Sequence, residues 1–363
     1  MKNPGVMVTG FPGFIAGRLM KDLLTSQEVQ HHYYFVVLTP FIQKAGEQCA
    51  GLESQFPEFK DSWTILEGDI RRRDLGIDAE TLKPIRKKIV RLWHLAAVYD
   101  LSVPLPFAYG VNVDGTQHVL DFCETLPNFE RLLYISTCYV AGKRSGMCYE
   151  NELDCAQDFK NHYESTKFWA EKLVQHRWDK IPTVIFRPAI VVGDSETGET
   201  IKGDGPYVIF QLLMRLPSWL PMVNVGTSKA TVNVVPVDFL TKAMATISNQ
   251  EGALGKVFQL ADPNPLQASD IIGLVVEAMD RAPVIGSVPS RWMEALLSVK
   301  PIERLVGIQR QAITYFNHPI SYDVQNTMEA LDGTGVRCPP LVSYLPTLIE
   351  YSRRNPNIFM KVQ

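Results

Sequence analysis

Tyr163 and Lys167, four residues apart, could form an acid–base pair. On a helix this spacing places both side chains on one face, with Cβ atoms about 5 to 6 Å apart. A free phenol has a pKa of about 10, too high for efficient proton transfer at neutral pH, and a neighbouring cation lowers it. We therefore expect Lys167 to activate Tyr163.

A hydroxyl side chain could complete this pair. Taken alone, a tyrosine and a lysine at this spacing are common surface residues. Thr137, however, follows the apolar run 131–136, which is a predicted strand. Ligands of open parallel sheets bind beyond the carboxyl ends of the strands. Thr137, Tyr163 and Lys167 are therefore predicted to form one catalytic site.

Small residues near the N-terminus mark a candidate phosphate-binding turn. Gly10, Gly13 and Ala16 have the spacing G-x-x-G-x-x-A. Glycine lets the backbone approach a pyrophosphate, and the start of a helix offers unpaired N–H groups. The same pattern would fit a tight strand-to-helix turn without a ligand. Its position between the first predicted strand and the first predicted helix favours nucleotide binding.

The elements that carry these motifs alternate along the first half of the chain. Short β-branched or aromatic runs are separated by longer amphipathic stretches, which is typical of βαβ units. The predicted strands are 5–9, 34–38, 63–67, 90–95, 131–136, 183–186 and 256–260, and the clearest helices are 14–24, 113–125 and 163–176. This pattern predicts an α/β protein with a Rossmann-type, doubly wound parallel sheet.

A second region is predicted where this alternation stops. Turn-rich segments at 193–199 and 203–206 interrupt the pattern. We expect a dinucleotide-binding domain at 1–192 plus about 230–262, and a smaller, mostly helical substrate-binding cap at about 193–229 and 263–363. Apolar and aromatic residues in this cap could cover a hydrophobic ligand, or pack a core equally well.

Composition limits the classes of function. The chain has 363 residues, with 36 Lys and Arg against 39 Asp and Glu, a formal net charge of −3. The chain lacks the excess of basic residues that is typical of nucleic-acid-binding proteins. Its apolar runs fall short of the roughly 20 residues of a membrane span. Without a recognisable leader, a cytoplasmic location is expected. The six cysteines contain no CxxC pair and fit free thiols, and the histidines lack metal-ligand spacing, so no metal site is expected.

In these motifs and their order the chain resembles the extended short-chain dehydrogenase/reductase superfamily. Within it, the chain is similar to the thioester-reductase-like and fatty-acyl-reductase-like, or male-sterility-type, branch. The matching segments are TGFPGFIA at 9–16, GDI at 68–70, HLAA at 94–97, NVDGT at 112–116, STCYVAG at 136–142, YESTK at 163–167, RPAIVVGD at 187–194 and VVPVD at 234–238. The branch is indicated by VVGDSETGE at 191–199, DGPY at 204–207 and the pattern at 338–344.

The resemblance implies roles for individual residues. Thr137, Tyr163 and Lys167 match the family's catalytic residues, Asn112 would support the site by hydrogen bonding, and Lys167 would also hold the nicotinamide ribose. The implied cofactor-binding residues are Gly10, Phe11, Pro12, Gly13, Phe14 and Ile15 at the pyrophosphate, Asp69 and Ile70 at the adenine, Ala96 and Ala97 behind the cofactor, and Pro188, Ala189, Ile190 and Val191 at the nicotinamide.

The chain departs from the family pattern in two places. The sequence LTPF at 38–41 has neither the acid that would bind a ribose 2′-hydroxyl nor the arginine that would bind a 2′-phosphate. NAD and NADP both stay open; the missing acid favours NADP, with Thr39, Lys44 and Arg18 as candidate phosphate neighbours. Cys138 stands where sugar-nucleotide dehydratases carry an acidic pair, so dehydration is disfavoured, and we interpret Cys138 as a small buried residue.

Together these features predict an NAD(P)H-dependent oxidoreductase that transfers hydride to a carbonyl. Thr137 and Tyr163 would bind the oxygen, and Tyr163 would donate the proton. The resemblance implies a hydrophobic ketone, aldehyde or acyl thioester as substrate, and a homodimer is possible. One alternative is an NAD-dependent sugar-nucleotide epimerase, which would need basic residues for a diphosphate. Others are a cofactor-binding protein without turnover and a peripheral membrane protein that binds through 292–316, although Pro301 breaks that segment.

Overall fold

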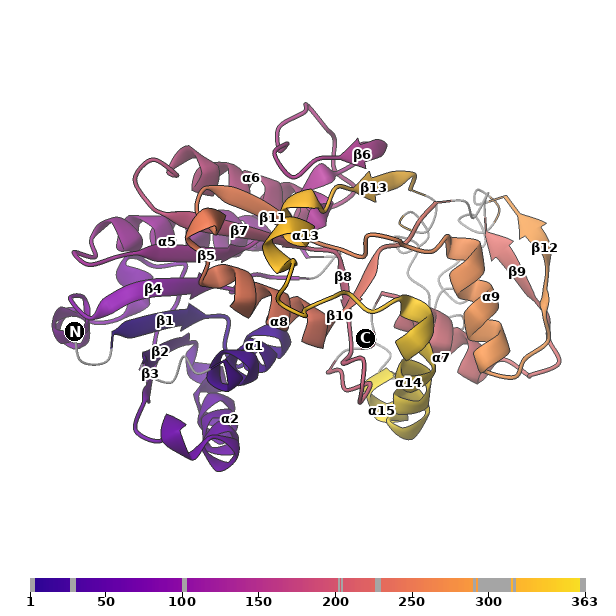
Figure 1. The fold of residues 1–363 in the computed structure, drawn as a ribbon, viewed down its shortest axis with the longest axis horizontal. Coiled ribbons are helices and arrows are strands. Elements are labelled where there is room, and N and C mark those ends of the chain that lie inside the picture. Colours follow the sequence, from indigo (N-terminus) through magenta and orange to yellow (C-terminus); the bar gives the residue numbers. More distant parts are fainter. Residues whose placement is uncertain are drawn as a thin grey trace.

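A seven-stranded sheet forms the centre of the protein in a computed structural model, which describes residues 4–26, 31–99, 103–201, 203, 205–225, 230–289, 292, 315 and 318–359. Its strands have the order β11-β7-β5-β4-β1-β2-β3, and all neighbouring strands in it are parallel. The order of connection reverses between β1 and β4, the point where ligands bind in doubly wound sheets. The predicted α/β, Rossmann-type fold is confirmed (Figure 1).

The strands of this sheet lie close to the predicted positions. They are β1 (Gly5–Thr9), β2 (His32–Val37), β3 (Trp63–Glu67), β4 (Ile89–His94), β5 (Arg131–Ile135), β7 (Thr183–Pro188) and β11 (Lys256–Leu260). The inner strands are buried almost throughout, because helices cover both faces of the sheet. This double burial explains why the strands are nearly continuous apolar runs in the sequence.

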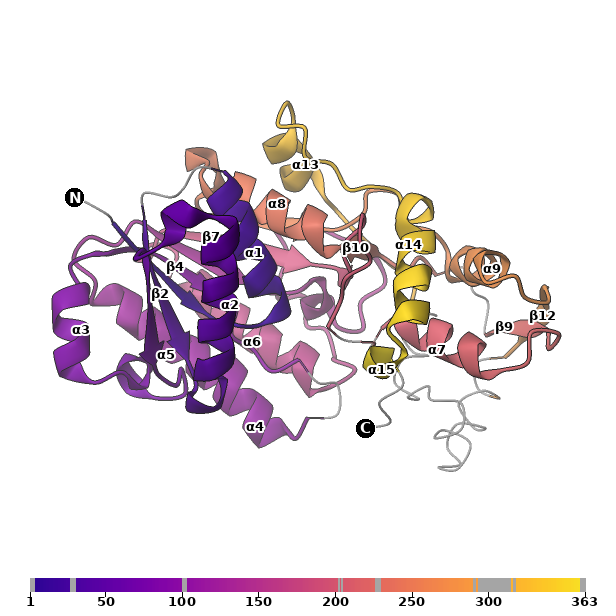
Figure 2. The same ribbon diagram turned by 90° about the horizontal axis from the view of Figure 1, so that it is seen from below.

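Two layers of helices enclose the sheet, as Figures 1 and 2 show. One layer is α1 (Phe14–Thr25), α2 (Ile42–Gln55) and α8 (Val237–Ser248), and the other is α3 (Ala79–Ile85), α5 (Gly115–Glu124) and α6 (His162–His176). The short helix α4 (Leu105–Tyr109) and a π-helical turn, η5 (Gly110–Asp114), lead into α5. The predicted helix at 113–125 therefore begins with a π-helical turn.

A smaller, mostly helical region lies beside the sheet, on the right in Figure 1. Its helices α7 (Tyr207–Arg215), α9 (Ala268–Ala278), α14 (Leu341–Arg354) and α15 (Pro356–Phe359) share one apolar core. Next to them lies the strand pair β9 (Met222–Val225) and β12 (Val284–Val288). Strands β8 (Ile190–Val192) and β10 (Val234–Pro236) link this region to the sheet. Most of the segment 292–316, assigned to the cap in the sequence, lies outside the described residues.

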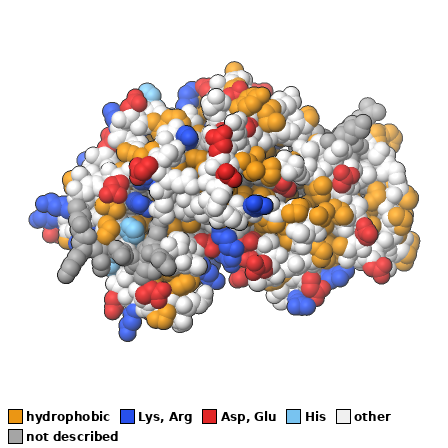
Figure 3. Space-filling view, viewed as in Figure 1, with side chains coloured by type: hydrophobic (Ala, Val, Ile, Leu, Met, Phe, Trp, Pro, Cys, Tyr) orange, Lys and Arg blue, Asp and Glu red, His pale blue; other side chains and the backbone are white. Residues whose placement is uncertain are grey.

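The remaining elements are short. They are the strand pair β6 (Gly146–Cys148) and β13 (Ile320–Tyr322), the helix α13 (Gln325–Leu331), and the 3₁₀ turns η2 (Thr39–Phe41), η3 (Pro57–Phe59), η4 (Arg73–Gly76), η6 (Cys138–Ala141) and η7 (Glu251–Ala253). Figure 3 shows charged side chains of both signs interspersed over one face, with hydrophobic side chains gathered toward the smaller region. Within the described residues, every helix is too short or too polar to span a bilayer.

Candidate active site

A cavity of about 710 Å³ opens beyond the carboxyl ends of the sheet strands. The predicted site residues that line it are Gly10, Phe11, Pro12, Gly13, Phe14, Ile15, Asp69, Ile70, Ala96, Ala97, Thr137, Tyr163, Lys167, Pro188, Ala189, Ile190 and Val191. Asn112, Arg18 and Thr39 are not part of this lining. The structure therefore brings most of the predicted positions, which are far apart in sequence, to one cavity.

The glycine-rich turn between β1 and α1 forms one wall of this cavity. Gly10 has a φ of +87°, and a Cβ at this position would lie 2.7 Å from the Ala96 nitrogen. A side chain is therefore excluded where the backbones of the β1 and β4 loops meet. The Gly13 N–H donates to the Gly10 carbonyl at 2.8 Å, and α1 begins at the next residue. A helix start at a cavity wall suits an anion such as a pyrophosphate, so these residues fit a dinucleotide.

Thr137 and Tyr163 meet at the opposite wall. Thr137 is the second residue after β5 and caps η6, where its Oγ1 accepts from the Tyr139 N–H at 3.2 Å. Tyr163 lies in the first turn of α6, which Asn161 caps. Both side chains are buried, and Thr137 lies near enough to Tyr163 to lower its pKa, against the larger effect of burial. Two hydroxyl side chains therefore line the same cavity, where they could bind a single carbonyl oxygen.

Lys167 lies one turn further along α6, and its ammonium group is turned toward the sheet. Nζ donates to the Ile135 carbonyl at 2.6 Å and to Tyr134 Oη at 3.1 Å. Burial lowers the pKa of Lys167 to about 7, and Glu171 opposes that shift. Burial also raises the pKa of Tyr163, and the hydrogen bond with Thr137 offsets only part of the rise. The expectation that Lys167 lowers the pKa of Tyr163 is therefore wrong for this structure.

Asn112 lies in the π-helical turn and supports the loop after β4. Its Oδ1 accepts from the Val98 N–H at 2.8 Å, while its Nδ2 donates to the Val98 carbonyl at 3.3 Å and to Thr166 Oγ1 at 3.0 Å. Thr166 belongs to α6, between Tyr163 and Lys167. Asn112 therefore connects the cavity loop to the helix that carries the candidate catalytic pair.

A series of buried, hydrogen-bonded side chains connects Asn112 to the residue before the glycine-rich turn. Thr9 Oγ1 is 2.8 Å from His94 Nδ1, and His94 Nε2 is 3.1 Å from Thr116 Oγ1. Thr116 donates to the Asn112 carbonyl, so its hydroxyl can accept from an Nε2–H group. Burial, and then Lys167, lowers the pKa of His94 to about 3, so this ring stays neutral.

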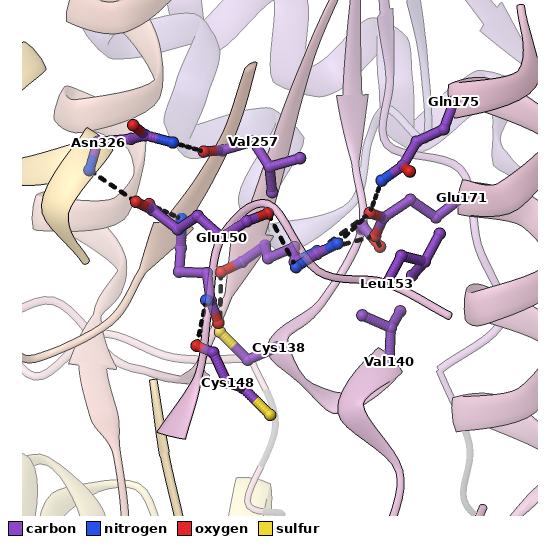
Figure 4. Close-up of polar contacts among 12 residues, drawn as sticks. Cys138, Val140, Cys148, Glu150, Leu153, Glu171, Gln175, Val257 and Asn326 are labelled. Atoms are coloured by element: carbon purple, nitrogen blue, oxygen red, sulfur yellow. Dashed lines mark hydrogen bonds and ion pairs between the residues drawn. The ribbon is translucent and has the colours of Figure 1, made fainter. Parts of the chain in front are cut away.

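A buried ion pair stands behind the candidate catalytic residues. Arg187 in β7 and Glu171 in α6 have almost no exposed surface, and Arg187 Nη2 lies 2.6 Å from Glu171 Oε1. Figure 4 shows Gln175 pointing to the same carboxylate, to which it donates at 2.9 Å. The Ser136 hydroxyl donates to the other oxygen of Glu171. The pair therefore ties α6 to β7 and to the residue before Thr137.

Glu150 forms a second buried carboxylate centre, which ties the loop after β6 to β11 (Figure 4). It accepts from the Gln259 N–H at 2.7 Å, the Asn326 N–H at 2.6 Å and the Thr327 hydroxyl at 3.2 Å. Burial raises the pKa of Glu150 to about 7, although these hydrogen bonds oppose the rise. Glu150 is outside the cavity lining, and its hydrogen bonds join the loop after β6 to β11 and α13.

Cys138 is a structural residue, as expected. It is buried, its Sγ lies 3.0 Å from the Arg187 carbonyl as a donor, and burial holds its pKa well above the ordinary value. A thiol with a raised pKa is a poor nucleophile at neutral pH. All six cysteines are free, so the prediction of free thiols is confirmed.

Apolar and aromatic residues of the cavity wall were missed in the sequence. They include Tyr99, Phe107, Tyr139, Ile201 and Tyr207. The Tyr99 ring meets the Tyr163 ring edge to face, with centroids 5.0 Å apart. Tyr139 and Tyr207 could have been found from their places in the STCYVAG and DGPY segments. Tyr99 and Phe107 lie in a loop whose sequence gives no such signal.

Two cations line the end of the cavity formed by the loops after β2 and β3. Lys44 is an exposed residue near the start of α2, and Arg71 follows Ile70. The Arg71 guanidinium binds both oxygens of Asp69, and these hydrogen bonds lower the pKa of Asp69. Asp69 is therefore already engaged by a cation, while Lys44 is a further cationic residue of the cavity lining.

The other two candidate phosphate neighbours make contacts elsewhere. The Thr39 hydroxyl donates to Glu67 Oε1 at 2.5 Å. Arg18 Nη2 pairs with Asp194 Oδ2 at 2.8 Å. Of the three neighbours suggested by the sequence, Lys44 is the one that lines the cavity.

Comparison with known proteins assigns the family. The sequence profile of the NAD-binding domain described as male sterility protein matches residues 8–244. The chain belongs to the male sterility protein family. Its branch within the extended short-chain dehydrogenase/reductases, predicted from the motifs, is confirmed, as is a nicotinamide-dinucleotide-binding domain.

Several relatives of this male sterility family protein are reductases. Fatty acyl-CoA reductase wat of Drosophila melanogaster is 25% identical over 280 residues, covering 67% of the chain and 53% of the fly protein. Aldehyde reductase lnaA of Aspergillus flavus is 26% identical over 376 aligned residues, covering 94% of the chain and 35% of the fungal protein. The chain thus spans about half and about a third of the lengths of these two relatives.

Solved structures agree on the fold. The terminal R domain from the myxalamid PKS-NRPS biosynthetic pathway has a TM-score of 0.83 at 22% identity, with 99% of this chain and 92% of that one covered. UDP-glucuronic acid 4-epimerase from Bacillus cereus has a TM-score of 0.67 at 18% identity, with 98% and 99% covered. At these identities the likeness shows the fold alone, which reductases and epimerases share.

Proposed function

We propose that this male sterility family protein reduces the carbonyl group of a hydrophobic aldehyde or acyl thioester with NADPH. The observation that carries the proposal is the meeting of Thr137 and Tyr163 in a cavity whose other wall fits a dinucleotide. The reductase relatives support the same reaction class. The bound nicotinamide would supply a hydride at this site.

Thr137 and Tyr163 would act on the carbonyl oxygen. Both hydroxyls would donate hydrogen bonds to it and stabilise the negative charge that develops. Burial raises the pKa of Tyr163, so its phenol is protonated at neutral pH and has a proton to donate. Lys167, whose pKa is lowered by burial to about 7, would hold a proton one helical turn from Tyr163. An aldehyde would gain one hydride and one proton and leave as an alcohol; a thioester would gain the same and release a thiol and an aldehyde.

The cavity lining favours an apolar substrate over a sugar nucleotide. The lining contains Tyr99, whose ring meets that of Tyr163, and also Tyr139, Ile201 and Tyr207. Within the described lining, the cations other than Lys167 lie at the far end, after β2 and β3, where the adenine half of the cofactor is expected. A nucleotide diphosphate would need cations on the substrate side.

The decisive experiment is a substrate panel with the purified protein. We expect NADPH oxidation with decanal or decanoyl-CoA, measured as the loss of NADPH absorbance. Chromatography should detect decanol from decanal and decanal from decanoyl-CoA. The control is the same mixture without the carbonyl compound. No oxidation with any hydrophobic aldehyde, ketone or thioester, or conversion of a UDP-sugar to its epimer, would contradict the proposal.

Lys44 is proposed as a ligand of the 2′-phosphate of NADPH, because it is a cavity-lining cation after β2. Lys44→Met is expected to raise the KM for NADPH about 10-fold, the effect of losing one charge-assisted hydrogen bond. The KM for NADH should stay the same. Lys60→Met removes an exposed cation outside the cavity and should change neither value. An equal rise for both cofactors would argue against a phosphate contact.

A further inference from the structure

The segment 193–200, which contains the GDSETG sequence, joins the sheet to the smaller region. Asp194 is its central residue, with a side chain only 4% exposed. Its Oδ2 pairs with Arg18 of α1, and its Oδ1 accepts from the N–H groups of Glu196 and Thr197, each at 2.9 Å. Burial opposes ionisation, but these N–H groups and Arg18 hold the pKa of Asp194 below its usual value. The loop is therefore organised around one carboxylate bound to α1.

A second set of hydrogen bonds attaches the same segment to α8. Asp238, in the first turn of α8, accepts from the Ser195 N–H at 2.8 Å and from the Ser195 hydroxyl at 2.7 Å. Helix α8 is itself joined to α1, because the Thr241 hydroxyl donates to Asp22. Both attachments therefore lead to the layer of helices that begins at the glycine-rich turn. The VVPVD motif, which ends at Asp238, supplies one of them.

The other contacts of this segment reach the smaller region. The Gly193 N–H donates to Tyr207 Oη at 2.8 Å, at the start of α7. Gly198 packs against α14 so closely that a Cβ there would lie 2.5 Å from the Tyr351 Cβ. The segment ends at Thr200, which lines the cavity together with Ile201 and Tyr207. The loop thus lies between the cofactor-binding helices and the wall that would hold the substrate.

We propose that the segment 193–200 positions the substrate wall, and that Arg18 is a positioning residue of this loop rather than a ligand of the cofactor phosphate. The Arg18–Asp194 pair and the Ser195–Asp238 bonds hold Thr200, Ile201 and Tyr207 at a set distance from α1. The substrate would therefore be held against Thr137 and Tyr163 only while both attachments are intact. This inference rests on the proposed function, because it assigns these three residues to the substrate.

The test uses Arg18→Gln, Asp194→Asn and the double variant, with Arg354→Gln as control, since Arg354 forms an exposed ion pair with Glu350. In the presence of NADPH, amide hydrogen exchange of the peptide from Thr200 to Tyr207 should be faster in the first three variants, with exchange in β4 unchanged. The KM for decanal should rise about 10-fold, equivalent to about 1.4 kcal/mol, with kcat within about 2-fold of the wild type. The effect of the double variant should not exceed that of the single ones, because each substitution removes the same pair.

Cofactor affinity separates the two roles of Arg18. A positioning residue predicts equal, small changes in the Kd for NADPH and for NADH. A selective loss of NADPH affinity would make Arg18 a phosphate ligand and overturn the proposal, as would unchanged exchange of the Thr200–Tyr207 peptide or faster exchange throughout the protein. A third outcome is that the variants show faster exchange confined to that peptide while the wild-type protein reduces no carbonyl. This outcome would refute the proposed function, but the positioning role would stand.

Discussion

Tyr163→Phe is expected to lose nearly all carbonyl reduction while it retains the nicotinamide cofactor. The substitution removes the hydroxyl that would donate a proton to the carbonyl oxygen, and general acid catalysis contributes about 10²- to 10⁴-fold to a rate. The ring itself stays, so its edge-to-face contact with Tyr99 can persist. Turnover should be measured as NADPH oxidation with decanal, and cofactor affinity by fluorescence titration.

A matched control separates chemistry from folding in this experiment. Tyr149→Phe removes the same hydroxyl from a residue whose side chain is half exposed and outside the cavity lining. We expect this variant to keep wild-type turnover and cofactor affinity. Normal turnover in Tyr163→Phe would remove Tyr163 from the mechanism. A loss of cofactor affinity as large as the loss of turnover would instead make Tyr163 a cofactor-binding residue.

The fold was predictable because its signals are local. Each inner strand of the sheet is buried on both faces, so β1 and β5 stand out as short apolar runs. The glycine-rich turn could also be predicted from the sequence, because the spacing of Gly10 and Gly13 reflects a close backbone approach that excludes a side chain at Gly10. The order of motifs then indicated most, but not all, of the residues that line the cavity at the carboxyl ends of the strands.

The electrostatics of the site could not be predicted, because they depend on contacts between distant residues. The spacing of Tyr163 and Lys167 suggested that the ammonium group would lower the pKa of the phenol. In the folded chain Lys167 binds the Ile135 carbonyl, and burial dominates the pKa values of both side chains. Arg18 is a similar case: its charge suggested a phosphate contact, but its partner Asp194 lies far along the chain.

Arg187→Met is expected to destabilise the protein by about 3 to 5 kcal/mol, because it would leave the Glu171 carboxylate buried without its ion-pair partner. Glu171 has no exposed side-chain surface, and Arg187 lies 2.6 Å from it. The Ser136 and Gln175 side chains would still donate to the carboxylate, but neither carries a charge. The loss should be measured as the free energy of unfolding in urea.

Arg131→Met provides the matched control for this prediction. Arg131 is also a buried arginine in a strand of the sheet, but its partner Glu251 has a side chain that is 89% exposed. Removing Arg131 therefore leaves a carboxylate in water and should cost less than removing Arg187. The double variant Arg187→Met, Glu171→Gln should recover part of the stability, since it removes the buried charge as well. Equal losses for Arg187→Met and Arg131→Met would show that the Arg187–Glu171 pair is not what holds α6, and with it Tyr163, against the sheet.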